Sequence, residues 1–218
     1  MFTLFDLKGG KKKRRRPIAW SQHVLSSPMM VKLHHFGITV TEYYHRGKEN
    51  IFPDIYGCPN PCCSNQGRLR RHGFYTRNAL TLLATYLIVI QRYYCPSCKK
   101  TVSLLPSFLA PRFQYSLACI FFTLFQYSVR HLQLHRVAEI INHRAGRHEM
   151  SHQQIRFYRQ RIYDNQPLIT TFLGQQGLFL VDLEPVSWLE AWSKHVFRQL
   201  ELFHLTYFTF QAHHFMAK

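Results

Sequence analysis

Two groups of cysteines constrain this chain more than any other feature of its sequence. The first group lies in CPNPCC at residues 58–63, and the second lies in CPSC at residues 95–98. A pair of cysteines on a tight turn grips one side of a metal ion, and two such turns close a tetrahedral site of four sulfurs. We therefore expect a structural zinc ion, with one cysteine of the first group left outside the site.

The choice of ligands follows from the spacing. Cys95 and Cys98 form one half of the site, and Cys58 shares the Cys-Pro step of Cys95. We prefer Cys63 as the partner of Cys58, although Cys62 is also sterically possible. Adjacent side chains point apart on an extended backbone, so only one of these two is expected to bind the ion. The predicted zinc ligands are Cys58, Cys63, Cys95 and Cys98.

The remaining patterns favour a reducing compartment. The longest apolar runs, residues 79–90 and 117–125, are shorter than the ~18 residues of a membrane-spanning helix. The N-terminal charges follow the apolar residues, which is the reverse of a secretory signal. We therefore expect a cytoplasmic protein without a membrane partner, whose thiols bind metal rather than form disulfides. Cys119, in an apolar helical stretch, is expected in the core.

The charge of the chain is strongly positive. Its 28 Lys and Arg against 11 Asp and Glu give a net charge of +17, and residues 55–138 contain ten Lys or Arg and no acidic residue. Such a balance favours a polyanionic partner over a merely solvated surface, which usually mixes both signs. Residues 1–30, with the run KKKRRR, are expected to form a disordered basic arm that contacts phosphates.

Alternating β-branched and aromatic residues predict short antiparallel strands around the cysteines. Pro106 and Pro111 then mark a linker. We expect a small zinc-ribbon domain over residues 31–105, in which one strand precedes the ribbon. The predicted strands are residues 37–44, 67–75, 86–94 and 100–105.

After the linker the periodicity becomes helical, so the fold class is α+β. Helices are predicted over 115–130, 133–145 and 151–163, the last beginning with a capping box from Ser151 to Gln154. These three suit a helix-turn-helix over residues 112–165. Residues 166–218 are expected to be a C-terminal extension with one amphipathic helix, in which Trp188, Trp192 and Val196 share a face.

The helix over 151–163 has two contrasting faces. Ile155, Tyr158 and Ile162 form an apolar stripe that can dock on the preceding helices. Arg and Gln on the other side suit bidentate contacts with bases in the major groove, although an ordinary amphipathic surface helix is the alternative. The predicted DNA-reading residues are His152, Arg156, Arg159, Gln160 and Tyr163. The predicted phosphate contacts on the ribbon are Arg68, Arg70, Arg71 and Arg77.

The segments CPNPCC, GRLRRHGFYTR and IQRYYCPSCKKTVSLLPSFLAPRFQYSL together show a resemblance. They are similar to an uncharacterised bacterial family of zinc-ribbon and helix-turn-helix proteins, related to the N-terminal regions of insertion-sequence transposases. The similarity covers residues 52–165. It implies DNA binding in a transposition or regulatory setting, and it supports the pairing of Cys58 with Cys63. The arm before residue 30 and the extra Cys62 depart from the family pattern.

These features predict a zinc-stabilised protein that binds double-stranded DNA, as an accessory or regulator of a mobile element. We expect it to be bacterial and associated with the nucleoid, with a transposase or another mobile-element protein as a possible partner. Only 36 residues follow Asp182, too few to complete a nuclease fold, so we expect no catalysis. The alternatives are a truncated transposase that lacks its nuclease domain, and an RNA-binding or protein-interaction module.

Overall fold

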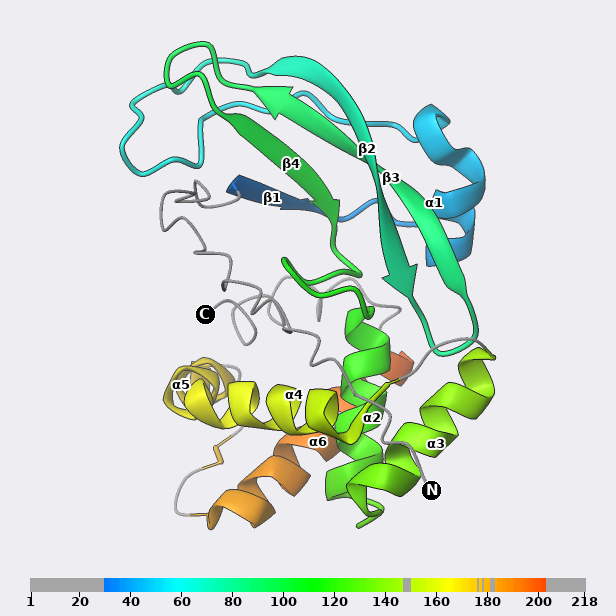
Figure 1. The fold of residues 1–218 in the computed structure, drawn as a ribbon. Coiled ribbons are helices and arrows are strands. Elements are labelled where there is room, and N and C mark those ends of the chain that lie inside the picture. Colours follow the sequence, from blue (N-terminus) through cyan, green and yellow to red (C-terminus); the bar gives the residue numbers. More distant parts are fainter. Residues whose placement is uncertain (1–29, 147–149, 176, 178, 181–182, 203–218) are drawn as a thin grey trace, which may run out of the picture.

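The sheet and the helices of this α+β chain form two units that lie one above the other (Figure 1). A computed structural model describes residues 30–146, 150–175, 177, 179–180 and 183–202. Apart from Met30, the predicted basic arm lies outside the described residues. The same holds for Asp182 and for residues 203–218, which include the end of the predicted C-terminal helix.

The upper unit is a four-stranded sheet with the order β1-β4-β3-β2. Its strands are β1 (Met30–His34), β2 (Arg70–Leu80), β3 (Thr85–Tyr94) and β4 (Thr101–Pro106). The last three overlap the strands predicted around the cysteines and are antiparallel, whereas β1 pairs with β4 in parallel. The register of β2 against β3 shifts between Arg71 and Phe74, where Gly73 adopts a φ of +87° that favours glycine.

The strand predicted at residues 37–44 is wrong, because most of this segment belongs to helix α1 (Val40–Arg46). Thr39 and Glu42 form a capping box: the Glu42 amide donates to Thr39 Oγ1 at 3.2 Å, and the Thr39 amide donates to Glu42 Oε2 at 2.8 Å. The fully buried Tyr43 then donates from its hydroxyl to the carbonyl of Val89 in β3. These contacts outweigh the β-propensity of the segment.

The sheet encloses a hydrophobic core of its own. Helix α1 and the short 3₁₀ helix η1 (Gly47–Glu49) lie against β3. The Tyr43 ring meets Phe36 and Phe108 edge to face, and the Tyr93 hydroxyl donates to the carbonyl of Pro53 at 2.6 Å. This unit is therefore stabilised by a hydrophobic core, unlike a small zinc ribbon, in which the metal replaces most of the core.

The lower unit consists of five helices. Ser116 caps the first, and α4 begins with the predicted capping box between Ser151 and Gln154. Gly146 follows α3 with a left-handed φ of +69°. None of the helices in the described ranges is both long and apolar enough to cross a membrane. The helices are α2 (Leu117–Ser128), α3 (Leu134–Ala145), α4 (His152–Asp164), α5 (Gln166–Gln175) and α6 (Pro185–Leu202).

Helix α5 was not predicted, because Pro167 was interpreted as a break after the preceding helix. Pro167 instead lies in the first turn of α5, where an amide hydrogen has no partner within the helix. Asn165 joins the two helices: its side chain donates to the carbonyl of Arg161, and its own carbonyl accepts from Ile169. The proline therefore marks the change from one helix to the next.

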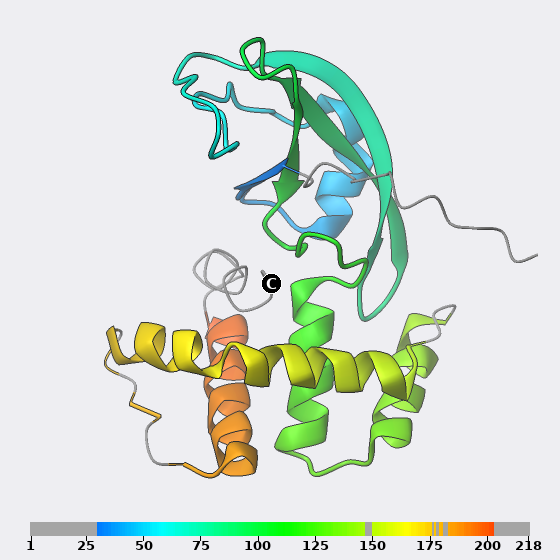
Figure 2. The same cartoon turned by 60° about the vertical axis from the view of Figure 1, so that its left-hand side comes forward.

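The last helix shares a core with the three helices of the predicted helix-turn-helix. Trp188 and Trp192 stack with their ring centroids 6.1 Å apart, and Trp192 meets Phe121 of α2 edge to face. Helix α6 lies beside α2, and α4 crosses α2 (Figure 2). As predicted, Trp188, Trp192 and Val196 form one buried face. The described part of the C-terminal region is thus integral to the helical unit.

The predicted linker after β4 is a packed junction between the two cores. Residues 107–110 are all buried. Leu80, at the end of β2, donates from its amide to the carbonyl of Gln114 at 2.9 Å and accepts from the amide of Ser116 at 2.8 Å. Because Leu80 belongs to the helical core, the sheet and the helices are connected by packing as well as by the chain.

The capping box of α1 can be tested at Thr39. Replacing Thr39 with Ala removes the hydroxyl that accepts from Glu42, and we expect a loss of about 1 kcal/mol in the free energy of unfolding, measured with urea. Replacing Thr39 with Ser keeps the hydroxyl and should leave that free energy nearly unchanged. Equal losses from both substitutions would contradict the cap.

Candidate metal centre and nucleic-acid interface

The four sulfurs predicted as ligands lie together, at the end of the sheet that faces away from the helices (Figure 1). They come from the loop before β2 and from the turn between β3 and β4. All four lie within 4.8 Å of one another. The Cys58 and Cys98 sulfurs are 3.6 Å apart, and the Cys63 and Cys95 sulfurs are 3.8 Å apart.

These distances fit a shared metal ion rather than disulfides. Four sulfurs at ~2.3 Å from a zinc ion would lie about 3.8 Å from one another, whereas a disulfide bond is only ~2.05 Å long. The four cysteines could therefore hold one metal ion, and a set of four thiolates is typical of structural zinc. Such a site has no open position for a substrate.

The backbone shapes both halves of the cluster. In the first loop the Cys58 amide donates to the carbonyl of Asn65 at 2.8 Å, and the Cys63 amide donates to that of Asn60 at 2.9 Å. In the second turn the Lys99 amide donates to the carbonyl of Cys95 at 2.9 Å, while Lys99 adopts a left-handed φ of +56°. Each pair of cysteines is thus held in a turn by hydrogen bonds of its own segment.

Two asparagines that the sequence reasoning missed act on the sulfurs. Burial alone would raise the pKa of Cys95, but hydrogen bonds from the backbone of Cys98 and Ser97 and from the Asn65 side chain outweigh it and lower this pKa to about 6. The Asn65 amide nitrogen is 3.4 Å from the Cys95 sulfur. For Cys98, burial is likewise outweighed, and the Lys100 backbone and the Asn60 side chain lower the pKa. The CPSC turn therefore favours thiolates, the form that binds metal.

The other two cysteines lie outside the cluster. Cys62 is exposed, and its amide donates to Asn60 Oδ1 at 3.3 Å. Cys119 is buried in α2, as predicted, and burial raises the pKa of its thiol to about 12. Of the adjacent pair, the structure brings Cys63 and not Cys62 to the other sulfurs.

The adjacent cysteines provide a matched test of the metal site. The Cys63→Ser variant should lose most of its zinc and melt at least about 5 °C lower, because one of four ligands is removed. The Cys62→Ser variant should keep one zinc ion per chain and an unchanged melting temperature. Zinc content would be measured by atomic emission after dialysis. Equal zinc content in the two variants would rule out Cys63 as a ligand.

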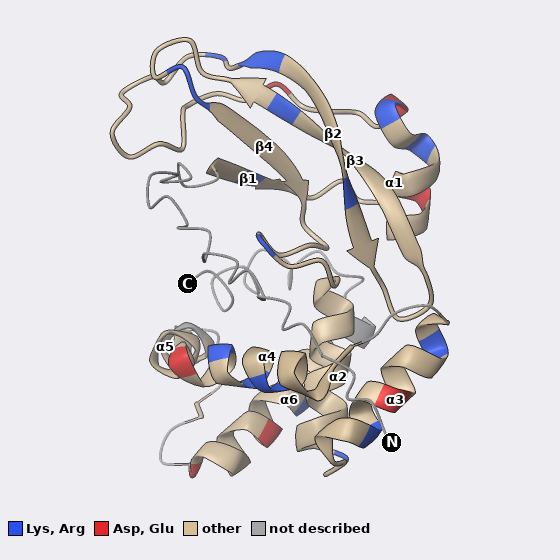
Figure 3. Cartoon of the chain, in the orientation of Figure 1, with Lys and Arg blue, Asp and Glu red and all other residues tan. Residues whose placement is uncertain are grey.

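Three of the four predicted phosphate contacts on the ribbon are exposed near the metal cluster. Arg68 forms an ion pair with Asp54 at 2.6 Å, and Arg71 donates to the carbonyl of Phe52 at 2.9 Å. Arg70 is exposed at the start of β2. The surroundings are basic as well, since Figure 3 shows Lys and Arg at this end of the sheet. Exposed ion pairs of this kind are weak and open to competition by phosphate.

Arg77 has a different role from the predicted phosphate contact. Its guanidinium is partly buried and donates to the carbonyls of Ala110 and Phe113, in the junction between the two cores. Burial lowers its pKa. The sequence could not distinguish it from the other ribbon arginines, because its partners lie more than 30 residues further along the chain.

In helix α4 the predicted apolar stripe is confirmed, since Ile155, Tyr158 and Ile162 are buried. The predicted reading residues are divided between two environments. His152, Arg156 and Gln160 are exposed, and Gln160 donates to Asp164 one turn later. Arg159 and Tyr163 are partly buried.

Arg159, one of the predicted reading residues, already contacts another helix of the protein. It donates from Nη1 to the hydroxyl of Tyr127 in α2 at 2.7 Å, and its guanidinium lies 5.4 Å from the centre of that ring. The exposed face is consequently rotated relative to the predicted one. It includes Gln153 and Phe157 along with Arg156 and Gln160.

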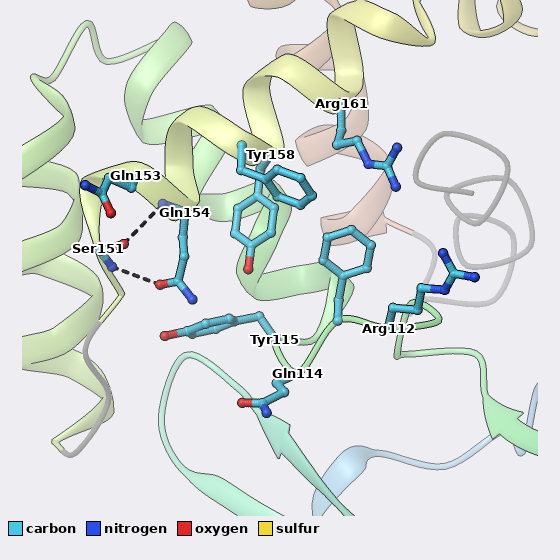
Figure 4. A pocket seen from close by; sticks show the side chains of 10 residues that line it. Arg112, Gln114, Tyr115, Ser151, Gln153, Gln154, Tyr158 and Arg161 are labelled. Carbon is cyan, nitrogen blue, oxygen red and sulfur yellow. Dashed lines mark hydrogen bonds between the residues drawn. The ribbon is translucent and has the colours of Figure 1, made fainter. Parts of the chain in front are cut away.

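A cavity on the flank of α4 was also missed. It has a volume of about 590 Å³ and lies between the helix and residues 112–115 of the junction (Figure 4). Arg112, Phe157 and Arg161 are among the residues that line it. Its sequence signals were the PRFQY stretch that begins at Pro111 and an aromatic residue at a non-core position of the helix.

One known protein family matches the part of the chain that contains the cysteine cluster and the junction. Residues 58–139 match a domain of unknown function (DUF6431). The matched segment begins at the first ligand cysteine and extends into α3, which is less than half of the chain. No curated protein and no solved structure matches the chain. The chain is thus similar to this domain over its central part.

The role of Arg77 can be tested against Arg70 on the same strand. Replacing Arg77 with Ala removes the guanidinium that donates to two carbonyls of the junction, although the Ala110 carbonyl still accepts from the Phe113 amide, and we expect the free energy of unfolding to fall by about 1–3 kcal/mol. Replacing the exposed Arg70 with Ala should change it by less than about 0.5 kcal/mol. Urea unfolding of the zinc-loaded variants measures both, and similar values would refute the internal role of Arg77.

Proposed function

We propose that this chain is a zinc-stabilised protein that binds double-stranded DNA through helix α4 and acts as an accessory or regulator of a mobile element. The observation that carries the proposal is the exposed face of α4. This face presents Arg156 between Gln153 and Gln160, and it is held outward by a buried apolar stripe. Arginine and glutamine are the side chains that bind guanine and adenine with two hydrogen bonds.

The connection between α3 and α4 supports this role. The Met150 amide donates to Asn142 Oδ1 at 2.6 Å, and the Asn142 side chain donates to the Met150 carbonyl at 3.2 Å. These bonds tie the start of α4 to the last turn of α3. A helix fixed in this way against its predecessor resembles the presentation of a reading helix in a helix-turn-helix.

The charge distribution supports nucleic acid as the partner. Basic residues lie at the metal end of the sheet and along α4 (Figure 3). The exposed basic residues at the cysteine end of the sheet include Arg70, Lys99 and Lys100. Two basic regions of this kind could contact the phosphates of one duplex at separate places, which would add affinity without sequence preference.

We also propose a binding role rather than a catalytic one. A metal held by four cysteines is closed to substrates, so zinc bound here would stabilise the loops at the end of the sheet. The mobile-element setting, the bacterial source and a transposase as partner are proposed from the resemblance of residues 52–165 to transposase-associated proteins.

The proposal is tested first by selecting ligands from a random duplex pool with zinc-loaded protein at near-physiological salt, where charge-driven binding is suppressed. We expect an enriched motif. The Arg156→Ala variant should then bind that motif about 5- to 150-fold more weakly but bind scrambled duplex almost as well as the parent protein does.

A charge-matched control comes from Arg198, which is exposed on α6. The Arg198→Ala variant removes the same charge and should weaken binding to both duplexes by the same small factor. If no motif is enriched, or if Arg156→Ala weakens both duplexes equally, α4 does not read sequence and this part of the proposal is wrong.

A further inference from the structure

We infer that the cavity between α4 and residues 112–115 binds one unpaired nucleotide, with its base against Phe157 and its phosphate between Arg112 and Arg161. The inference rests on the proposed function only in that it takes nucleic acid as the partner. It assigns a second site on the same helix, next to the exposed face that contacts the duplex. The same chemistry would suit a free nucleotide, and the experiment below separates the two sources.

The size and the walls of the cavity suit such a ligand. Its volume of about 590 Å³ falls within the range of pockets that enclose small organic ligands. One wall is α4, and the other is the junction segment that follows Pro111. Because a base in a duplex is stacked on both sides and paired on its edge, only an unpaired or displaced base could enter between these walls.

One end of the cavity is strongly basic. Arg112 and Arg161 both lie at this end (Figure 4), and none of the described residues that line the cavity is acidic. The Nε group of Arg161 is buried and has no hydrogen-bond acceptor among the described residues. A guanidinium group presents several donors in a fixed plane, which match the oxygens of a phosphate. A phosphate at this end would accept hydrogen bonds from the terminal guanidinium nitrogens of Arg112 and Arg161.

The start of α4 lies apart from this basic end. Its capping box satisfies two amides there: the Gln154 amide donates to Ser151 Oγ at 3.2 Å, and the Ser151 amide donates to Gln154 Oε1 at 2.9 Å. In Figure 4 these residues lie at the opposite end of the cavity from the two arginines. The phosphate is therefore assigned to the arginine end.

The middle of the cavity offers aromatic surface. Phe157 is 49% exposed although it is a large apolar side chain. Its ring centre is 5.9 Å from that of Phe113, which also lines the cavity, and the guanidinium of Arg161 lies 5.5 Å from the Phe157 ring centre. A nucleobase stacked on Phe157 would cover this surface. Stacking of this kind does not depend on which base is bound.

An amide group lines another part of the cavity. Gln114 is exposed and lies away from the two arginines (Figure 4). Its carboxamide offers a donor and an acceptor, which can pair with the edge of a base. The order of groups along the cavity is thus guanidinium, aromatic ring and carboxamide, which corresponds to phosphate, base face and base edge.

The segment that carries Arg112 is fixed by hydrogen bonds from strand β2. Arg112 adopts a left-handed φ of +69°, which is uncommon for a residue with a side chain. The partly buried guanidinium of Arg77 donates to the carbonyls of Ala110 and Phe113, which lie on either side of Arg112 in the sequence. Strained backbone that is fixed by its surroundings is typical of ligand sites. Arg77 is therefore a positioning residue for this cavity.

The test compares two fluorescent DNA hairpins with the same duplex, one blunt and one with a three-nucleotide single-stranded overhang, by fluorescence anisotropy. The parent protein should bind the overhang hairpin at least about 10-fold more tightly. Replacing Phe157 with Ala should reduce that advantage to less than about 2-fold, because one stacked base is worth ~5- to 150-fold in affinity. The Arg112→Gln variant should also reduce it.

Matched controls separate this site from the duplex-reading face. Phe157→Trp keeps an aromatic ring and should keep the overhang advantage, whereas Arg198→Gln should weaken both hairpins equally. Because Phe157 also lies on the exposed face of α4, the blunt hairpin is measured with every variant, and the overhang advantage is taken as the ratio of the two affinities. If the Arg156→Ala variant binds the blunt hairpin more weakly, that result concerns duplex binding by α4 and not the cavity. Thermal melts of each variant exclude unfolding as the cause.

The source of the ligand is decided by competition with adenosine monophosphate. If millimolar mononucleotide binds to the parent protein but not to Phe157→Ala, and the overhang gives no advantage, the cavity takes a free nucleotide and the site stands with that source. The proposal is wrong if Phe157→Ala and Arg112→Gln leave both measurements unchanged. These are the preference for the overhang hairpin and the binding of the mononucleotide. Blunt-duplex binding can persist in either case.

Discussion

The hydrogen bonds of the partly buried Arg77 guanidinium are the interaction on which the arrangement of the two cores depends. The guanidinium holds the carbonyls of Ala110 and Phe113 at the end of β2, where Leu80 is also hydrogen-bonded to the start of the helical unit. A polar group taken from water is tolerated only when it is hydrogen-bonded, so the junction has little freedom to move once this contact forms. The position of the sheet relative to α4, and with it one wall of the cavity, follows from this contact.

The metal cluster occupies the other end of the same ribbon. Strands β2 and β3 contain 11 and 10 residues, so they span roughly 35 Å between the cysteines and the junction. A metal ion at the cysteines could not contact a ligand in the cavity. Its contribution to nucleic-acid binding would be indirect, through the loops that carry Arg68, Arg70 and Lys99. Because the sheet has a core of its own, the effect of metal loss should be greatest in these loops.

Local signals allowed much of this structure to be predicted, and distant contacts explain most of the errors. The cysteine turns, the cap at Ser151 and the apolar stripe of α4 are each encoded within a few residues. A strand was wrongly predicted at residues 37–44. The β-propensity of this segment is overcome by a helix cap and by the burial of Tyr43 against a strand, where its partner lies 46 residues further along the chain. Arg159 was misassigned for a similar reason, since its partner Tyr127 lies 32 residues earlier on another helix. Periodicity shows which side of a helix is polar, but it does not show which polar side chains are already bound.

The contrast between Arg159 and Arg161 shows how the cavity differs from ordinary packing. Both lie over an aromatic ring, and both have a buried Nε that finds no acceptor in the part of the chain that the structure describes. Under Arg159, however, the ring is that of Tyr127, whose hydroxyl accepts a hydrogen bond at 2.7 Å and completes a contact within the protein. Under Arg161 the ring is that of Phe157, which offers no oxygen and is itself half exposed. A charged donor and an apolar ring that line the same cavity suit a ligand that is both anionic and aromatic, and a nucleotide has both properties.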